Sequence, residues 1–190
     1  MGHEGIDWLE RDNREDEEAP SKAVAALGLK PSHVVADIGA GSGYHTFRIA
    51  PLVPEGKVFA VDIQPEMLDF IDSRSKVLGI TNVNPHRGAI DDVRLPPNSI
   101  DLALMVDAYH EFSHPKEMLE SLMNSLRPGG RVVLLEYRAE DPNVPIKRLH
   151  KMTEQQIRLE FESIGFQWVK THDFLPWQHM VVFEKPIPSP

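Results

Sequence analysis

The sequence predicts an α/β protein with a doubly wound parallel sheet that helices cover on both faces. Two observations support this fold class. Apolar, strand-like runs alternate with amphipathic helical segments along most of the chain, which is typical of a parallel sheet. A turn with three glycines also follows the first buried strand, at the sheet edge where such folds bind ligands.

The N-terminal half predicts three helix–strand units. Its elements are a helix over 21–27, a strand over 33–37, a helix after Gly43 to about Leu52, a strand over 57–62, a helix that begins at Pro65, and a strand over 82–87. Pro65 suits a first helical turn, where its missing N–H costs nothing. Met67, Ile71 and Leu78 fall on one face of that helix. Pro85 interrupts the last of these strands and weakens it.

The C-terminal half continues the alternation and ends in two adjacent strands. Its elements are a strand over 100–106, a helix with an apolar face at positions 119, 122, 123 and 126, a strand over 131–137, a helix from Thr153 to Gly165, and strands over 166–174 and 178–183. Pro128-Gly129-Gly130 ends the first helix. Thr153 and Gln156 form a capping box for the second helix, and Gly165 closes it.

Composition sets the broad class of protein. The chain has 190 residues, of which 41% are hydrophobic and 26% are charged, so one soluble domain is expected. No apolar run reaches the roughly 20 residues of a membrane span, and the polar N-terminus is not a secretory signal. We therefore expect a cytoplasmic protein. The net charge of −9 disfavours a nucleic-acid partner. Cysteine is absent, which excludes disulfides and thiolate catalysis.

The glycine-rich turn is the strongest functional signal. It runs from Asp37 to Gly43 as Asp-Ile-Gly-Ala-Gly-Ser-Gly, and Asp62 ends the next strand. Glycines let the backbone approach a ligand closely, and the following helix presents free N–H groups to it. Asp62 stands where an acidic residue would meet ribose hydroxyls. These residues resemble the first motif of the class I S-adenosylmethionine (SAM)-dependent methyltransferases, an acidic residue followed by glycine-x-glycine-x-glycine.

The resemblance covers about residues 34–183 and implies a Rossmann-like, seven-stranded, mostly parallel sheet. In this family the last strand lies antiparallel beside the fifth. The Leu-Arg-Pro-Gly-Gly-Arg stretch at 126–131 matches the family's turn into the fifth strand. The chain is similar to the small-molecule branch that includes ubiquinone/menaquinone C-methyltransferases and arsenite methyltransferases. It departs from the latter because it has no cysteine.

Two alternatives to a methyltransferase stay open at this point. One is an NAD-linked oxidoreductase on the same kind of sheet, whose fingerprint is G-x-G-x-x-G. Tyr44 disfavours it, because it replaces the third glycine, which those enzymes need for close packing of helix on strand. The other is a SAM-binding regulatory module without turnover.

The resemblance implies a cofactor contact for several residues. Asp62 would bind both ribose hydroxyls of SAM, and Ile63 and Met67 would flank the adenine. Asp37 and Asp107 would lie near the methionine moiety. The same site would release S-adenosylhomocysteine as product.

One adenine contact departs from the family pattern. Relatives usually carry an acidic residue directly after the glycine that corresponds to Gly88, and here Ala89 takes that place. Asp91 or Asp92 is the expected substitute. The full set of expected cofactor-binding residues is Asp37, Gly39, Ala40, Gly41, Gly43, Asp62, Ile63, Met67, Gly88, Ala89, Ile90, Asp91 and Asp107.

Candidate catalytic residues follow the fourth strand, in a loop that faces the transferring methyl group in the family. Histidine titrates near neutral pH and can remove a proton from an attacking atom. His110 and Tyr109 are therefore the first candidates for acid/base catalysis, with His150 as a third. The alternative interpretation is that Tyr109 and His110 pack the loop.

The same loop contains a match to a zinc-peptidase motif, because residues 110–114 read His-Glu-Phe-Ser-His. That motif needs both histidines on one helical face. A strand is predicted to end just before His110, and Ser113 with Pro115 indicates a helix start. We therefore predict no metal site.

The segment from Tyr137 to Met152 is expected to arch over the methyl-transfer site. Lys147, Arg148, His150 and Lys151 are cations within five positions, which suits an anionic substrate group. The alternative is a solvated loop. Further candidate lining residues are Glu136, Tyr137, Trp177, Gln178 and His179.

The expected organisation is an acidic N-terminal segment over 1–20, a methyltransferase domain over 21–185 and a tail over 186–190. The acidic run from Glu10 to Glu18 is interpreted as solvated, and Trp8 to Arg11 as a candidate lid. The expected partner is a small-molecule methyl acceptor, with no nucleic acid and no membrane. The protein is expected to be a monomer or a homodimer.

Overall fold

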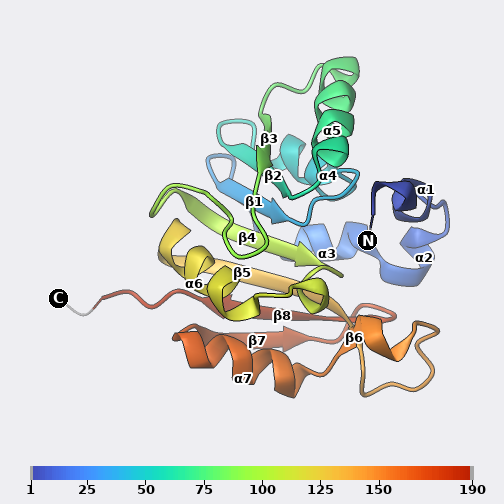
Figure 1. Ribbon diagram of the computed structural model, residues 1–190, viewed down its shortest axis with the longest axis vertical. Coiled ribbons are helices and arrows are strands. Elements are labelled where there is room, and N and C mark those ends of the chain that lie inside the picture. Colours follow the sequence, from blue (N-terminus) through green and yellow to red (C-terminus); the bar gives the residue numbers. More distant parts are fainter. Residues whose placement is uncertain (1, 189–190) are drawn as a thin grey trace.

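One twisted sheet runs through the middle of the computed structural model, which describes residues 2–188 (Figure 1). Within those residues the sheet has eight strands. Seven of them follow the order β3-β2-β1-β4-β5-β8-β7, and the eighth, β6, pairs with β5 off this path. The strands are β1 Val34–Ile38, β2 Lys57–Asp62, β3 Val83–Arg87, β4 Ile100–Val106, β5 Leu126–Arg138, β6 Lys151–Met152, β7 Gln167–His172 and β8 Gln178–Glu184.

The strand directions confirm the predicted fold class. β8 runs antiparallel to both β5 and β7, while the pairs β1–β2, β1–β4, β2–β3 and β4–β5 are parallel. The one difference in the strand count is β6, a two-residue strand in which Lys151 pairs with Tyr137. β3 lies at an edge of the sheet, the only position where Pro85 is tolerated without breaking a central ladder.

Helices cover both faces of the sheet and close two apolar cores. On one face, Ala23 of α3, Ile49 of α4 and Ile71 of α5 pack against strand residues. On the other face, Leu122 of α6 and Phe161 of α7 do the same. These helices are α3 Pro20–Ala26, α4 Thr46–Ile49, α5 Pro65–Leu78, α6 Pro115–Ser125 and α7 Glu154–Ile164, and the short 3₁₀-helix η2 Ala50–Leu52 extends α4.

Local signals fix the helix ends, as α7 illustrates. The Thr153 hydroxyl accepts a hydrogen bond from the Gln156 N–H at 3.1 Å, and Gly165 ends the helix with φ 100°. Both features were predicted. Leu78 was predicted on the buried face of α5 and is instead 53% exposed, because it lies in the last turn, beyond the contact with the sheet.

The predicted Pro-Gly-Gly break lies inside a strand. α6 ends at Ser125 and β5 begins at Leu126. Residues 127–130 form an irregularity in the pairing with β4. They stay in the sheet because Gly129 and Gly130 exchange backbone hydrogen bonds with Lys185.

Three segments gather at the edge of the sheet toward which the arrow of β4 points (Figure 1). The N-terminal segment folds into η1 His3–Gly5, α1 Ile6–Leu9 and α2 Arg14–Glu18. The loop after β4 contains η3 Tyr109–Glu111, and the loop after β5 contains η4 Arg148–His150. No helix within the described residues is long and apolar enough to cross a membrane.

Candidate active site

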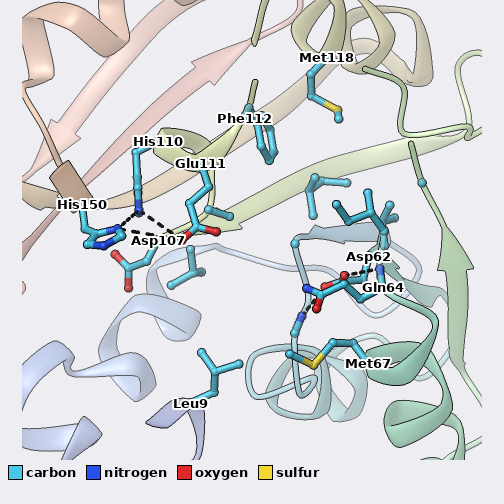
Figure 2. Close-up of a pocket in the computed structure, with 18 of the residues that line it drawn as sticks. Leu9, Asp62, Gln64, Met67, Asp107, His110, Glu111, Phe112, Met118 and His150 are labelled. Atoms are coloured by element: carbon cyan, nitrogen blue, oxygen red, sulfur yellow. Dashed lines mark hydrogen bonds and ion pairs between the residues drawn. The ribbon is translucent and has the colours of Figure 1, made fainter. Parts of the chain in front are cut away.

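A cavity of about 520 Å³ opens beyond the C-terminal ends of β1, β2, β4 and β5. The N-terminal segment and the loop after β5 complete its walls. Figure 2 shows Asp62, Gln64 and Met67 on one side and His110, Glu111 and His150 on the other. Eleven residues predicted for the site line the cavity, namely Gly39, Gly41, Asp62, Ile63, Met67, Gly88, Ala89, Ile90, Asp107, His110 and His150.

Asp62 is held by the backbone around it. One carboxylate oxygen accepts a hydrogen bond from the Gly41 N–H at 2.9 Å, and the other accepts one from the Gln64 N–H at 2.9 Å. The two bonds fix the orientation of the carboxylate, while each oxygen keeps a lone pair for a further donor.

Two glycines of the glycine-rich turn lie where a side chain would be unfavourable. A Cβ at Gly39 would lie 2.9 Å from Cβ of Ala108, and one at Gly41 would lie 2.9 Å from Cδ1 of Leu9. Both glycines also have positive φ, 72° and 54°, which side-chain-bearing residues rarely adopt. The backbone therefore forms the floor of the cavity directly.

Four residues predicted to bind the cofactor do not line the cavity: Asp37, Ala40, Gly43 and Asp91. Asp37 is buried beneath the turn, where one carboxylate oxygen accepts a hydrogen bond from the Thr46 hydroxyl at 2.6 Å. The neighbour of Asp91, Asp92, does line the cavity. One of its carboxylate oxygens already accepts hydrogen bonds from the Ser121 hydroxyl and the Arg94 N–H.

Asp107 carries a buried oxygen without a protein partner among the described residues. Its Oδ2 accepts a hydrogen bond from Nε2 of Gln178 at 2.7 Å, and Oδ1 accepts none. Burial raises the pKa of this carboxyl well above its ordinary value, and the nearby Glu18 and Glu136 raise it further. Its φ of 49° is in the left-handed region, so the backbone is strained at this point. A buried oxygen without a protein partner calls for a water molecule, a proton or a ligand at this position.

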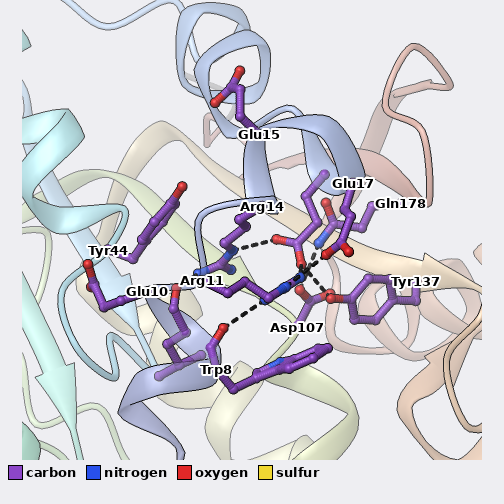
Figure 3. Close-up of polar contacts among 12 residues, drawn as sticks. Trp8, Glu10, Arg11, Arg14, Glu15, Glu17, Tyr44, Asp107, Tyr137 and Gln178 are labelled. Carbon is purple, nitrogen blue, oxygen red and sulfur yellow. Dashed lines mark hydrogen bonds and ion pairs between the residues drawn. The ribbon is translucent and has the colours of Figure 1, made fainter.

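The N-terminal segment is anchored by a buried ion-pair network (Figure 3). Glu18 is its centre and is 1% exposed. Its carboxylate accepts hydrogen bonds from Arg11, from Nε of Arg14 at 2.6 Å and from the Tyr137 hydroxyl at 2.6 Å. Burial raises the pKa of Glu18, but Arg14, Tyr137 and Arg11 together lower it below its ordinary value. The interpretation of residues 10–18 as a solvated run is therefore wrong, because tertiary partners bury part of it.

The same segment reaches over the glycine-rich turn. Glu10 accepts hydrogen bonds from the Ser42 hydroxyl at 2.6 Å and from Nη1 of Arg74 at 2.8 Å. Trp8 and Leu9 line the cavity. Residues that are far from the glycine-rich turn in the sequence thus form one wall of the cavity.

Tyr44 occupies a sandwich of two cations rather than a nucleotide contact. The guanidinium of Arg48 lies 3.6 Å from its ring centroid, and that of Arg14 lies 4.2 Å away. The ring is 8% exposed. It fills the space that a third glycine leaves free in dinucleotide-binding folds.

His110 is held in one orientation by a buried carboxylate. Nδ1 of His110 lies 2.7 Å from Oε2 of Glu136, which is fully buried at the end of β5. The other oxygen of Glu136 accepts the Tyr109 N–H at 2.9 Å, so the same carboxylate fixes η3. The contact fits the tautomer in which the Nδ1–H donates to the carboxylate and Nε2 keeps its lone pair. Nε2 of His110 lies 3.1 Å from Nδ1 of His150.

Tyr109 was predicted as a catalytic residue, and the structure places it elsewhere. Its ring is 2% exposed and packs edge-on against Phe112 and Phe161. Its hydroxyl donates to Oε2 of Glu160 at 2.7 Å. Burial and Glu160 raise the pKa of this hydroxyl above its ordinary value. Tyr109 does not line the cavity, so these contacts favour the packing interpretation for this residue.

Only part of the predicted cluster of cations at positions 147–151 faces the cavity. Lys147 and His150 line the cavity, and Arg148 does not. The ammonium of Lys151 donates to the carbonyls of Asp141 and Val144, which closes the loop on itself. Of the further candidates, Tyr137 lines the cavity, whereas Glu136, Trp177, Gln178 and His179 do not.

Two residues at this site have contacts that their sequence positions do not reveal. Glu136 was named only as a lining candidate, although it positions His110 from below the cavity. Glu18 was assigned to a solvated run. A buried carboxylate at a strand end is a detectable signal for Glu136, whereas no local pattern distinguishes Glu18 from the acidic residues beside it.

Comparison with known proteins identifies a family match and close structural neighbours. A family model described as "Methyltransferase domain" matches residues 29–179. The chain is 31% identical over 114 residues to an uncharacterized methyltransferase, YcgJ, of Bacillus subtilis, a match that covers 60% of this chain and 44% of that protein. It is 30% identical over 112 residues to the ubiquinone/menaquinone biosynthesis C-methyltransferase UbiE of Ectopseudomonas mendocina, with 58% of this chain and 44% of that protein covered. These matches span about half of the length of each relative.

The structural comparison agrees on the fold. A crystal structure of a SAM-dependent methyltransferase from Aquifex aeolicus superposes with a TM-score of 0.91 at 24% identity, covering 97% of this chain and 99% of that one. The crystal structure of YcgJ superposes with a TM-score of 0.72 at 16% identity, covering 90% of this chain and 99% of that one. The predicted alternation of strands and helices and the antiparallel last strand are thus those of a known fold.

The buried carboxyl beneath the glycine-rich turn gives a pH prediction. Burial raises the pKa of Asp37 from 3.8 to about 6. The unfolded chain loses this proton near pH 4 and the folded chain near pH 6, so the free energy of unfolding should fall as pH rises between these values. An Asp37→Asn variant lacks this titration, and its stability relative to the native protein should rise by up to about 3 kcal/mol between pH 4 and pH 7. Urea unfolding at several pH values measures this difference.

The matched control for this measurement is Asp72→Asn on the exposed side of α5. Asp72 forms only a surface ion pair with Lys76, so its variant should show no comparable trend. A stability difference for Asp37→Asn that stays constant across this pH range would contradict the raised pKa.

Proposed function

This chain belongs to the class I SAM-dependent methyltransferases, and we propose that it transfers the methyl group of SAM to a small polar molecule that carries an anionic group. One observation carries the proposal. The cavity has the fixed Asp62 carboxylate and the bare glycine backbone on one side, and the oriented imidazole of His110 on the other. Cofactor and acceptor would meet between them.

The residues of the cavity fit SAM. Asp62 is fixed with lone pairs available for two ribose hydroxyls. Ile63, Met67 and Ile90 supply apolar surface for an adenine ring. Oδ1 of Asp107, which has no partner among the described residues, is an acceptor suited to the ammonium group of the methionine moiety. SAM supplies an electrophilic methyl group when bound.

The acceptor side of the cavity supplies a base and an orienting group. We propose that Nε2 of His110 removes the proton of the acceptor as its nucleophilic atom attacks the methyl group in line. Glu136 keeps the proton of His110 on Nδ1 and stabilises the imidazolium that forms. Alignment rather than covalent help is the main requirement of such a displacement.

An anionic group on the acceptor has a matching partner in Lys147. This side chain lines the cavity on the same loop as His150. A lysine ammonium offers three donors and a point charge, which suits a carboxylate or phosphate. The rest of the acceptor wall includes the apolar Phe112, Met118 and Ile146, so a molecule with both polar and apolar parts fits best.

We also propose that residues 1–20 act as a lid over a domain formed by residues 21–185, with 186–190 as a tail. Residues 1, 189 and 190 lie outside the described part of the chain. The proposal is supported by Leu9 against Gly41 and by Glu10 on Ser42 and Arg74. Because these contacts cover the glycine-rich turn, the cofactor has to enter past them.

Two other functions are less consistent with these contacts. An NAD-linked oxidoreductase would need the space that Tyr44 fills between Arg14 and Arg48. A SAM-binding module without turnover would have no use for a buried carboxylate that orients His110 toward the cavity.

The first functional prediction concerns the cofactor. Asp62→Ala should weaken binding of SAM and of S-adenosylhomocysteine by about 1.5–3 kcal/mol, because two hydroxyls lose a charged acceptor. Isothermal titration calorimetry measures these affinities, with NAD as the competing ligand. Asp72→Ala, an exposed acidic residue outside the cavity, is the matched control and should bind SAM normally. Tighter binding of NAD than of SAM would refute the cofactor assignment.

The second functional prediction separates an enzyme from a binding module. His110→Ala should lower turnover by about 10²–10⁴-fold and leave SAM affinity nearly unchanged, because His110 lies across the cavity from Asp62 (Figure 2). The assay is methyl transfer to the best acceptor from a broad screen. His114→Ala is the control, because His114 is exposed and contacts only Ser113 through its ring. Unchanged turnover in His110→Ala would assign that residue to packing alone.

The third functional prediction concerns the acceptor. Lys147→Met should raise the KM for the acceptor and leave kcat largely unchanged, since an ion pair with a remote anionic group is shared by ground and transition states. Steady-state kinetics with varied acceptor concentration measure the two constants. Arg148→Met removes a charge next to it that does not line the cavity, and should have no such effect. An equal rise in KM for both variants would indicate a general effect of charge.

A further inference from the structure

Three potential metal ligands from two separate loops converge at the acceptor end of the cavity. Nε2 of His110 lies 3.1 Å from Nδ1 of His150. An oxygen of Glu111 lies 4.0 Å from each of these two nitrogens. His110 and Glu111 belong to η3, after β4, and His150 belongs to η4, after β5. Figure 2 shows the three side chains directed toward one another.

These distances are close to those of a coordination sphere. Two ligand atoms at about 2.1 Å from a tetrahedral zinc ion are about 3.4 Å apart. The two nitrogens already have nearly this separation. The carboxylate of Glu111, whose side chain is 37% exposed, needs to approach each nitrogen by less than an ångström.

The residue types match a transition metal rather than magnesium or calcium. Two imidazoles and one carboxylate are the protein ligands of many catalytic zinc sites, which keep a further position open for water or substrate. Imidazole nitrogen suits zinc, copper, iron and nickel, whereas magnesium and calcium prefer oxygen ligands. Among these ions, zinc is the best match, because it has no redox chemistry and is often held by two imidazoles and one carboxylate.

The buried Glu136 supplies the outer contact that such sites require. Metal-binding histidines usually donate their other ring N–H to a carboxylate, which fixes the tautomer and raises the basicity of the ligand nitrogen. Glu136 accepts that N–H from Nδ1 of His110 at 2.7 Å and is fully buried. The lone pair on Nε2 then faces Nδ1 of His150, which donates to it in the metal-free protein and would lose that proton on binding a metal.

We infer that His110, Glu111 and His150 bind one divalent transition-metal ion, best matched by zinc, with an open position toward the cavity. The site differs from the H-E-x-x-H motif in the sequence, because its second histidine comes from the loop after β5. His114 lies at the start of α6, in a separate element from His110, and makes a ring contact with Ser113 instead. Binding of a metal and acceptance of a proton use the same lone pair of His110, so the two roles exclude each other at any one time.

The test is metal titration of the untagged, full-length protein after treatment with a chelator. We expect isothermal titration calorimetry with Zn²⁺ to give one site per chain, and Co²⁺ to give the visible absorption of a four- or five-coordinate ion. His110→Ala and His150→Ala should each lower zinc affinity at least about 100-fold, and Glu136→Gln should lower it about 10–100-fold. His114→Ala is the matched control and should bind zinc as the native protein does.

Each outcome of the titration bears on the site directly. SAM affinity and circular dichroism of His150→Ala report whether the variant is folded. We expect it to fold, because His150 lies on a surface loop and its side chain is 41% exposed. Absence of a stoichiometric site, or equal zinc binding by folded His150→Ala and native protein, would overturn the inference. Loss of binding in His114→Ala would assign the metal to the sequence motif instead. The measurement uses no acceptor, so a failure of the methyl-transfer proposal is distinguishable from a failure of this one.

Discussion

The order of the strands reverses at β1, and the functional site depends on this reversal. From β1 the chain proceeds outward to β2 and β3 on one side and to β4 and β5 on the other. The helices that follow β1 and β2 pack on one face of the sheet, and the helix that follows β4 packs on the opposite face. A crevice is left beyond the strand ends where the two directions separate. The strands β1, β2 and β4 border this crevice. Their C-terminal ends carry the glycine-rich turn, Asp62, Asp107 and His110, so one topological constraint brings these residues together.

A buried ion-pair network forms the wall of this crevice on the N-terminal side. Charges away from water are costly unless each has several partners. Glu18 meets this condition through Arg11, Arg14 and Tyr137, whereas Asp107 meets it only in part. The remaining oxygen of Asp107 thus keeps an uncompensated cost of burial. The raised pKa of this carboxyl reflects the same cost, because a proton relieves it, and a cationic ligand would do so as well.

The sequence predicted the sheet better than it predicted the site. Strands such as β2 and β4 were placed to the residue, because a buried parallel strand is a short apolar run between turn residues. Gly39, Gly41 and Asp62 were placed in the cavity because backbone geometry restricts such turns to glycine. By contrast, the contact between His110 and His150 joins loops that are 40 residues apart. This contact depends on the two-residue strand β6, which no local pattern specifies. It also depends on the 3₁₀-helix η3, in which the side chain of His110 faces the cavity and that of Tyr109 does not.

The position of Pro85 also has a consequence for whether β3 can pair with a strand of another chain. β3 is one edge of the sheet, and Pro85 in its middle has no N–H to offer a further strand. Unprotected sheet edges are templates for pairing between chains. At this edge the proline interrupts any continuous ladder with a neighbouring molecule. Growth of the sheet from chain to chain would therefore have to begin at the opposite edge, along β7, where Lys170 places a charge on the exposed strand. The residue that made β3 the weakest strand in the sequence thus disfavours strand pairing between chains at this edge.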